Sequence, residues 1–411
     1  MNSKWLRTTE IFDEYERRFA AARAEKKMSR FPQDRETVLE GVKKMLCWQD
    51  ALVPDVGDLQ EQSRRDYVNY YAAECIYSTW PEFWGSATLF MPKTQEKVPL
   101  VFVCCGHGED GRRTGSYQAM GHRLASLGMA ALVMDNIGQG DRAKDPTVFK
   151  TADHWFSLAP FYCGLTLQGM IVMETVALIR KMAKDQRFSK LAACGNSGGG
   201  TLTMFLAAMA PELEVLSSSG YPSEVNYLLA KERRHCACNL LEGTAFGPEM
   251  WEIYSLFAPK PLLLEGGKHD NLIPLDLAHR NARKVKNTYA QYGSEKICFQ
   301  LTDTRHSWDL ADLNLISGFL CENLMGVTPA EADVMSTEPA VPVKMPASML
   351  STEDLAQKIT GKTMPADTKL CDIYVPQFEG KPVDPNEIQL DVGRGDVMRV
   401  FAQMECALKK N

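Results

Sequence analysis

From about residue 85 onward, short apolar runs alternate with longer helical patterns. The short runs are predicted strands at 98–105, 129–134, 191–194, 215–218, 261–264 and 296–301. The longer segments are predicted helices at 118–127, 165–182, 201–209, 274–292 and 310–324. Nearly continuous apolar strands separated by helices are typical of a parallel sheet that is covered on both faces. The expected fold class is therefore α/β, with a doubly wound, mostly parallel sheet over residues 85–327.

The segments on either side of this region have different patterns. Residues 1–84 are predicted to form an N-terminal helical extension, helical to about residue 80. Segment 11–23 carries apolar residues three and four apart, and Asp34 is a suitable N-cap for a second helix. Residues 328–411 are predicted to form a C-terminal extension. Eight of the 21 prolines lie between Pro329 and Pro385, so this part should be extended and rich in loops, with a closing helix at 396–409.

Composition places the chain among ordinary globular proteins. Its 411 residues are 45% hydrophobic and 24% charged, which excludes wholesale disorder and a fibrous repeat. No run of about 18 uncharged apolar residues occurs, so no contact with a membrane is expected. The formal net charge is −6, which argues against a nucleic-acid partner, because phosphate binding usually needs a basic face.

The first residues and the cysteines bear on location and metal content. Charges at Glu10 and Asp13 precede any apolar run, so no secretory signal is visible and a cytoplasmic location is expected. The twelve cysteines are scattered through apolar runs and are expected to be buried, reduced thiols. The His-Cys-Ala-Cys cluster at 235–238 lacks a second ligand pair at zinc-site spacing. No metal site is therefore expected there.

The most specific signal is the sequence GNSGGG at residues 195–200, between a predicted strand and a predicted helix. It contains the G-x-S-x-G pattern, in which a serine occupies a strained strand-to-helix turn and small neighbours leave its hydroxyl exposed. Ser197 is the expected nucleophile, and the N–H of Gly198 is an expected oxyanion donor. The alternative interpretation is a glycine-rich turn with a structural role only.

A serine nucleophile needs an imidazole base and a carboxylate that orients the imidazole. In this kind of site the chain order is serine, acid, histidine. His306 follows the last predicted strand and is the expected base. Its competitor is His269, which follows the preceding strand, whereas His279 lies within a helical run beside arginines.

The acid is expected in the loop after the strand at 261–264, where Asp270 is the only aspartate. Asp276 in the next helix and Glu265 at the end of the strand are the fallbacks. Asp135 also ends a predicted strand, but its expected role is structural, in the turn that follows it.

The second oxyanion donor is expected in the loop after the strand at 98–105. The sequence Gly106-His107-Gly108 lets the backbone come close to a substrate, and the N–H of Glu109 is the candidate donor. His107 itself is expected to be structural rather than a substrate contact.

Together these motifs resemble the α/β-hydrolase superfamily, and within it the dienelactone-hydrolase-like and acetyl-xylan-esterase-like bacterial enzymes. The resemblance covers about residues 80–327. It is carried by 106–108, 135–142, 195–201, 235–239, 258–263, and His306 with Trp308. Members of this group are esterases and deacetylases that use no cofactor. The resemblance therefore implies an α/β-hydrolase fold and an acyl-enzyme mechanism, with Ser197, Asp270 and His306 as the triad.

Two features depart from these relatives. Many relatives are exported, whereas no signal peptide is visible here, which argues against polymeric xylan as the substrate. The Pro-rich segment after Val327 is not part of the minimal hydrolase domain. It could wrap the domain, join an oligomer or shape a neighbour's pocket, and the two extensions together suggest a homodimer.

The expected function is a serine carboxylesterase that acts on a small-molecule substrate, a short-chain ester of a sugar or small natural product, with acetyl as the default acyl group. One alternative is the same triad acting on a carbon–carbon, amide or peptide bond, and another is a non-catalytic binding protein on the same fold. Segments 136–165 and 219–257 are expected to shape the pocket. Their aromatic residues could line it or belong to the core: Phe156, Phe161, Tyr162, Tyr221, Phe246 and Trp251.

Overall fold

The computed structural model describes residues 28–108, 110–143, 159–225, 239, 241–242, 247–335 and 338–368. It also gives the backbone of two short strands, β10 (Gln377–Phe378) and β11 (Lys381–Pro382). The predicted helical patterns at 11–23 and 396–409 and the cluster at 235–238 lie outside the described residues. Within the described ranges, no helix is long and apolar enough to cross a lipid bilayer.

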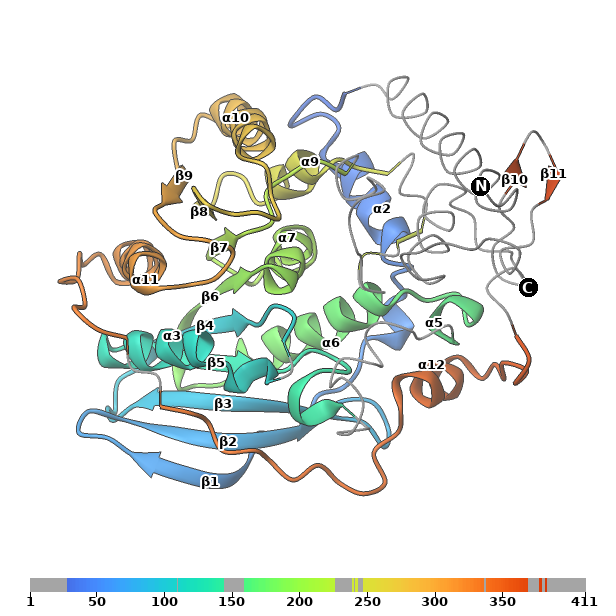
Figure 1. Ribbon diagram of the computed structural model, residues 1–411, viewed down its shortest axis with the longest axis horizontal. Coiled ribbons are helices and arrows are strands. Elements are labelled where there is room, and N and C mark those ends of the chain that lie inside the picture. Colours follow the sequence, from blue (N-terminus) through green and yellow to red (C-terminus); the bar gives the residue numbers. More distant parts are fainter. Residues whose placement is uncertain are drawn as a thin grey trace, which may run out of the picture.

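Nine strands form one sheet in the order β1-β2-β3-β5-β4-β6-β7-β8-β9 (Figure 1). The strands are β1 (Gln60–Asp66), β2 (Tyr70–Ser78), β3 (Trp84–Pro92), β4 (Val98–Cys104), β5 (Ala130–Met134), β6 (Phe188–Asn196), β7 (Val215–Ser219), β8 (Leu262–Gly267) and β9 (Ile297–Thr302). The pairings among β1, β2, β3 and β5 are antiparallel, and all pairings from β5 across to β9 are parallel. Parallel strands end at one common edge, where doubly wound folds place their ligands.

Helices cover both faces of this sheet. The main described helices are α2 (Arg35–Met45), α3 (Gly115–Ser126), α5 (Ala159–Tyr162), α6 (Leu167–Met182), α7 (Gly198–Met209), α9 (Met250–Ser255), α10 (Leu275–Gln291), α11 (Leu310–Met325) and α12 (Thr352–Thr360). The short 3₁₀ turns are η1 (Asp50–Leu52), η2 (Gly111–Arg113) and η3 (Gly140–Arg142). α3 and α11 contribute to one apolar cluster, and α2, α6, α7, α9 and α10 contribute to the other.

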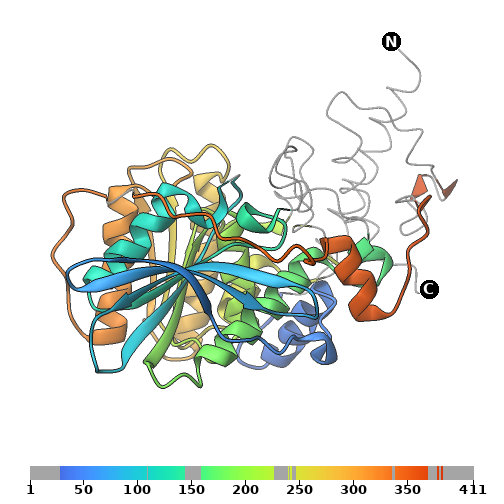
Figure 2. The ribbon, with the colours of Figure 1, turned by 90° about the horizontal axis from the view of Figure 1, so that it is seen from below.

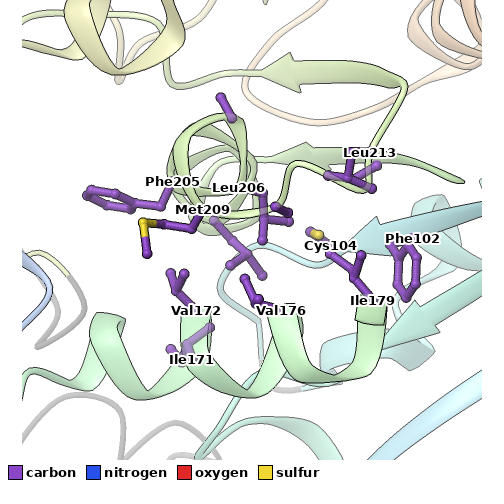
Figure 3. Packing of buried hydrophobic residues seen from close by; sticks show 14 of the residues in the cluster. Phe102, Cys104, Ile171, Val172, Val176, Ile179, Phe205, Leu206, Met209 and Leu213 are labelled. Carbon is purple, nitrogen blue, oxygen red and sulfur yellow. The ribbon is translucent and has the colours of Figure 1, made fainter. Parts of the chain in front are cut away.

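Strand β4 shows how the two clusters divide the sheet. Phe102 and Cys104 belong to the cluster that includes α6 and α7, whereas Val101 and Val103 belong to the cluster that includes α3 and α11. Figure 3 shows Phe102 and Cys104 near the apolar side chains of α6 and α7. Successive strand side chains point to opposite faces, so a strand buried on both faces is apolar at every position. This explains the continuous apolar runs in the sequence.

The doubly wound sheet predicted for residues 85–327 is confirmed, and the predicted strands and helices lie close to their observed bounds, but β3 and α9 were not predicted. The prediction that residues 1 to about 80 are helical is wrong between Gln60 and Ser78, where β1 and β2 extend the same sheet. β1 is an edge strand whose residues are mostly exposed, so its sequence is polar throughout. β2 is buried at most positions, so neither strand shows the alternation by which strands are usually found.

The C-terminal extension is mostly extended over its described residues, as predicted, but it also contains α12, which was not predicted. We call residues 338–350 the strap. In Figures 1 and 2 it runs past the antiparallel strands toward α12, which packs on α5. The Gln62 side chain binds both backbone groups of Lys344 at 2.8 Å, and the N–H of Leu350 donates to the carbonyl of Glu82 at 3.0 Å. The described part of the extension therefore wraps its own domain.

A buried arginine joins the strap to the sheet. Arg112 has no exposed surface and forms ion pairs with Glu74 and with Asp141, the latter at 2.7 Å. Its Nη2 also donates to the carbonyl of Val341 at 3.0 Å. In return, the N–H groups of Val341 and Val343 donate to the carboxylates of Glu74 and Asp141, each at 3.1 Å. One cation thus holds β2, the turn after β5 and the strap together.

Replacing Arg112 with methionine is expected to lower the free energy of unfolding by about 3–5 kcal/mol, because the carboxylates of Glu74 and Asp141 would lose the fully buried guanidinium that pairs with both of them. Urea denaturation of the full chain measures this change. The matched control is Arg180→Met, since Arg180 is partly exposed and pairs with Glu212 at 3.3 Å on the surface. Arg180→Met should lower the free energy of unfolding by less than about 1 kcal/mol. Equal losses in the two variants would contradict the role given to Arg112.

Candidate active site

The candidate nucleophile Ser197 lies between the end of β6 and the start of α7, with φ 58° and ψ −116°. A positive φ is strained for any residue with a Cβ, and such strain is typical of catalytic turns. Small neighbours are required here, because a Cβ on Gly199 would overlap the carbonyl of Cys104 and a Cβ on Gly195 would overlap Gly199. The glycines of this sequence therefore follow from the close approach of the turn to the end of β4.

The structure brings the predicted base and acid into direct contact. His306 Nδ1 and Asp270 Oδ2 are 2.7 Å apart, and the two side chains are 13% and 2% exposed. The other carboxylate oxygen of Asp270 accepts the N–H groups of Leu272 (2.6 Å) and Ile273 (3.0 Å). Burial alone would raise the pKa of Asp270, but the hydrogen bond from His306 and these two N–H groups lower it overall. Asp270 is therefore a carboxylate with a fixed orientation.

The bond to Asp270 determines which imidazole nitrogen can act as a base. With its proton on Nδ1 and donated to the carboxylate, His306 carries its lone pair on Nε2. Nε2 is buried and has no hydrogen-bond partner among the described residues. Nothing in the described part of the chain, the Ser197 hydroxyl included, donates a hydrogen bond to this acceptor.

The nucleophile and the base both contact the backbone at the end of β7. The N–H of Ser197 donates to the carbonyl of Ser219 at 3.1 Å. The next residue, Gly220, has φ +59°, and a Cβ on it would lie 3.2 Å from Cε1 of His306. The imidazole of His306 therefore packs on Gly220, the residue that follows Ser219, whose carbonyl accepts the N–H of Ser197. All three predicted triad residues lie at the carboxyl ends of parallel strands, on one edge of the sheet.

The loop after β4 faces the start of α7. The N–H of Gly198, the predicted oxyanion donor, is in the first turn of a helix, where N–H groups lack partners within the helix and the dipole is positive. A Cβ on Gly198 would lie 2.7 Å from the ring of His107, so this histidine packs against the start of α7. The second predicted donor, Glu109, lies outside the described residues.

One contact that the sequence did not reveal fixes this loop. The N–H of Gly106 donates to the hydroxyl of Tyr117 at 2.7 Å, and the ring of Tyr117 meets Trp308 edge to face at 5.5 Å. Tyr117 on α3 therefore connects the loop after β4 with the loop of His306. Nothing in the local pattern of α3 distinguishes Tyr117 from an ordinary core residue.

The alternative acids and bases lie elsewhere. His269 Nε2 is 2.9 Å from Asp303, and both side chains are mostly exposed. His279 packs against Phe299, and Asp276 is an exposed partner of Arg280.

Asp135 is buried in a structural network, where it accepts the hydroxyl of Ser86 and the backbone N–H of Arg112, both at 2.7 Å. Glu265, toward the carboxyl end of β8, is buried beside Asp312. Over the described ranges, no group of three or more histidine, cysteine or acidic side chains is arranged to hold a metal ion.

The aromatic candidates for the pocket are largely core residues. Phe161 and Trp251 are buried in the main apolar cluster, and Tyr162 packs against it. Tyr221 is also buried there, with its hydroxyl donating to Asn239 at 3.0 Å. The remaining two, Phe156 and Phe246, lie outside the described residues.

No protein-family model matches the chain. A curated relative, the candidate hydrolase YtaP of Bacillus subtilis (strain 168), is 25% identical over 193 residues. The matched part is 46% of this chain and 61% of YtaP, so the chain spans about three fifths of that relative's length.

Several solved structures share the architecture. The methylesterase BT1017 is 18% identical with a TM-score of 0.52, over 78% of this chain and 64% of its own. A candidate acetyl xylan esterase from Bacteroides fragilis NCTC 9343 is 14% identical with a TM-score of 0.55, over 66% of this chain and 75% of its own. A glucuronoyl esterase from Solibacter usitatus is 11% identical with a TM-score of 0.54, over 70% and 91%.

The fold is that of an α/β-hydrolase. The fold class predicted from the sequence is thereby confirmed. At such low identities an α/β-hydrolase likeness establishes the fold, and the reaction has to be argued from the site.

The two histidine–aspartate pairs, His306–Asp270 and His269–Asp303, allow a matched test. Asp270→Asn is expected to lower kcat by about 10²–10⁴-fold, because an amide at this position no longer holds the imidazole as the correct tautomer. Asp303→Asn, which alters the exposed pair with His269, should leave kcat unchanged. The measurement is ester hydrolysis by folded variants. A loss confined to Asp303→Asn would identify His269 as the base instead.

Proposed function

We propose that this α/β-hydrolase is a serine carboxylesterase with Ser197 as nucleophile, His306 as base and Asp270 as the orienting acid. The observation that carries the proposal is the His306 imidazole. Asp270 fixes its Nδ1, its buried Nε2 lacks a partner among the described residues, and the same edge of the sheet carries a serine at a strained φ. A buried, unpaired acceptor is costly unless a reacting group uses it.

In the proposed mechanism, Nε2 of His306 removes the proton of Ser197 as its Oγ attacks the ester carbonyl. The oxyanion is stabilised by the N–H of Gly198 and by a second N–H, proposed to be that of Glu109. The alcohol leaves with the proton from His306. His306 then removes a proton from the water that attacks the acyl-enzyme, and returns this proton to the Ser197 oxygen as the acid is released. Asp270 stabilises the imidazolium in both steps.

The proposed substrate is a short-chain ester, acetyl by default, of a sugar or small natural product. The names of the structural neighbours support this at the level of the bond, since acetyl xylan, glucuronoyl and methyl esters are all carboxylic esters. The acyl group differs among those names, so the acetyl assignment rests on the resemblance to acetyl-xylan-esterase-like enzymes and not on particular residues of the site.

Wild-type protein is expected to hydrolyse p-nitrophenyl acetate faster than the butyrate, and Ser197→Ala to lower kcat by about 10³–10⁶-fold. Steady-state kinetics of both esters measures this. The matched control is Ser126→Ala, an exposed serine in the last turn of α3, which should retain full activity. A fluorophosphonate should add one adduct to the wild type and none to Ser197→Ala. A folded wild type that is inactive on both esters would contradict the esterase proposal and favour carbon–carbon or amide cleavage.

A further inference from the structure

Two buried acids next to the triad loops take no part in the mechanism above. We propose that Glu265 and Asp312 share a single proton and act as positioning residues, holding the loop of His306 in register with the loop of Asp270. This inference rests on the proposed function, because it deepens the role of the same site.

The two carboxyl groups come from different elements and meet in the interior. Glu265 lies on β8 and is 3% exposed, and Asp312 lies in the first turn of α11 and is 1% exposed. The hydroxyl of Thr302, at the end of β9, lies 3.2 Å from Glu265 Oε1 and 2.6 Å from Asp312 Oδ1. These three side chains connect β8, β9 and α11.

The hydrogen bonds among Glu265, Asp312 and Thr302 require one proton more than the Thr302 hydroxyl supplies. Thr302 has a single hydroxyl hydrogen, yet its oxygen lies close to three others, the third being that of Thr304 at 2.8 Å. A protonated Glu265 can donate to Asp312, whereas two ionised carboxylates can only accept. A proton on the pair therefore turns a repulsive contact into a hydrogen bond.

No cation neutralises the pair, since neither acid has an ion-pair partner among the described residues. Burial disfavours the charged form of each group, and two adjacent carboxylates repel one another. Burial, and then the charge of Asp312, raise the pKa of Glu265 to about 8, and burial also raises the pKa of Asp312. At neutral pH the pair therefore holds one proton. The groups that surround it are three hydroxyls and one acid: Ser219, Thr302, Thr304 and Asp309.

On the acid side, the pair is connected to the triad by short backbone links. Gly267 comes two residues after Glu265, and its carbonyl accepts the N–H of Asp270 at 3.1 Å. The carbonyl of Glu265 itself accepts the N–H of Gly220 at 3.1 Å, and Gly220 packs on the imidazole. A shift of Glu265 would therefore move Gly220, which packs on His306, and the backbone that holds Asp270.

On the base side, the links are equally short. Asp312 Oδ2 accepts the N–H of Asp309 at 2.9 Å, and Asp309 comes three residues after His306. Thr304, two residues before His306, packs closely on Gly267. A Cβ on Gly267 would lie 2.6 Å from the carbonyl oxygen of Thr304. The segment that carries the base is thus held at both ends by residues in contact with the pair.

This arrangement predicts a loss of activity above about pH 8 and a loss of stability between about pH 4.5 and 8. Above about pH 8, loss of the shared proton places two buried charges side by side, and their repulsion should displace the His306 loop. Stability should begin to fall at lower pH. The pKa of Glu265 is higher in the folded state than its ordinary value of 4.5, so the native state retains a proton that the unfolded state releases. The contribution of Glu265 therefore declines as pH rises from about 4.5 to about 8.

The test compares Glu265→Gln with Glu265→Leu. The amide keeps the size of the side chain and donates to Asp312 at every pH, so kcat at pH 7 should stay close to that of wild type. Its kcat should not decline near pH 8, and its Tm should fall less than that of wild type between about pH 5 and 8. Leucine cannot donate, and it should lower kcat at all pH values by about 10- to 100-fold with little change in KM, because the base is misplaced.

The matched control is Glu322→Gln, an exposed acid on the same helix as Asp312, which should keep the wild-type pH profile and Tm. The inference is overturned if Glu265→Gln declines near pH 8 as wild type does, or loses as much kcat as Glu265→Leu. If wild type hydrolyses neither ester, the proposed function fails separately. In that case the Tm series alone decides whether the proton is shared, and equal pH dependence in wild type and Glu265→Gln refutes it.

Discussion

The first turn of α7 lies almost in contact with the backbone at the end of β4, and the geometry of the site depends on this approach. The approach requires glycine on both sides: a Cβ on Gly199 would overlap Cys104, and a Cβ on Gly106 would lie 2.6 Å from the carbonyl of Asn196. The strain of Ser197, of the order of 1–3 kcal/mol, persists because this packing leaves no relaxed alternative. The same approach brings the serine beside the loop where oxyanion donors are expected.

Around this turn the protein buries carboxyl groups in three different electrostatic settings, and each setting suits a different task. Asp270 is stabilised as an anion by His306 and two N–H groups, which suits a residue that must orient and stabilise an imidazolium. Asp135 lies beside the Arg112 guanidinium and binds loop N–H groups, which suits a permanent anchor, although burial still raises its pKa. Glu265 has no cation among the described residues and is left with a proton, which suits a hydrogen-bond donor between two loops.

The sequence was sufficient wherever the signal was local. The sharp turn at Ser197 needs small neighbours within four residues, so it is visible in the string itself. The order of acid and base along a doubly wound sheet then predicted Asp270 and His306, which the structure brings to 2.7 Å from one another.

The sequence was insufficient wherever the deciding contact joins distant segments. β1 is polar throughout, and only its pairing with β2 makes it a strand. No local sequence pattern distinguishes Tyr117 or the Glu265–Asp312 pair, because their roles depend on contacts with residues of other elements. Glu265 was a fallback for the catalytic acid on sequence position alone, and the pleat of β8 directs it into the interior instead.

The strap shows why the C-terminal extension cannot be treated as an appendage to a complete hydrolase domain. Without residues 341 and 343, the carboxylates of Glu74 and Asp141 would each lose a backbone donor, and Arg112 would lose a carbonyl acceptor. Buried polar groups that lose their partners destabilise whatever structure holds them. Arg112 lies in the loop after β4, and Asp141 lies in the turn after β5, so the loss would fall on two loops at the catalytic edge of the sheet. The strap is therefore part of the framework that positions this edge, although it is remote from the triad in the sequence.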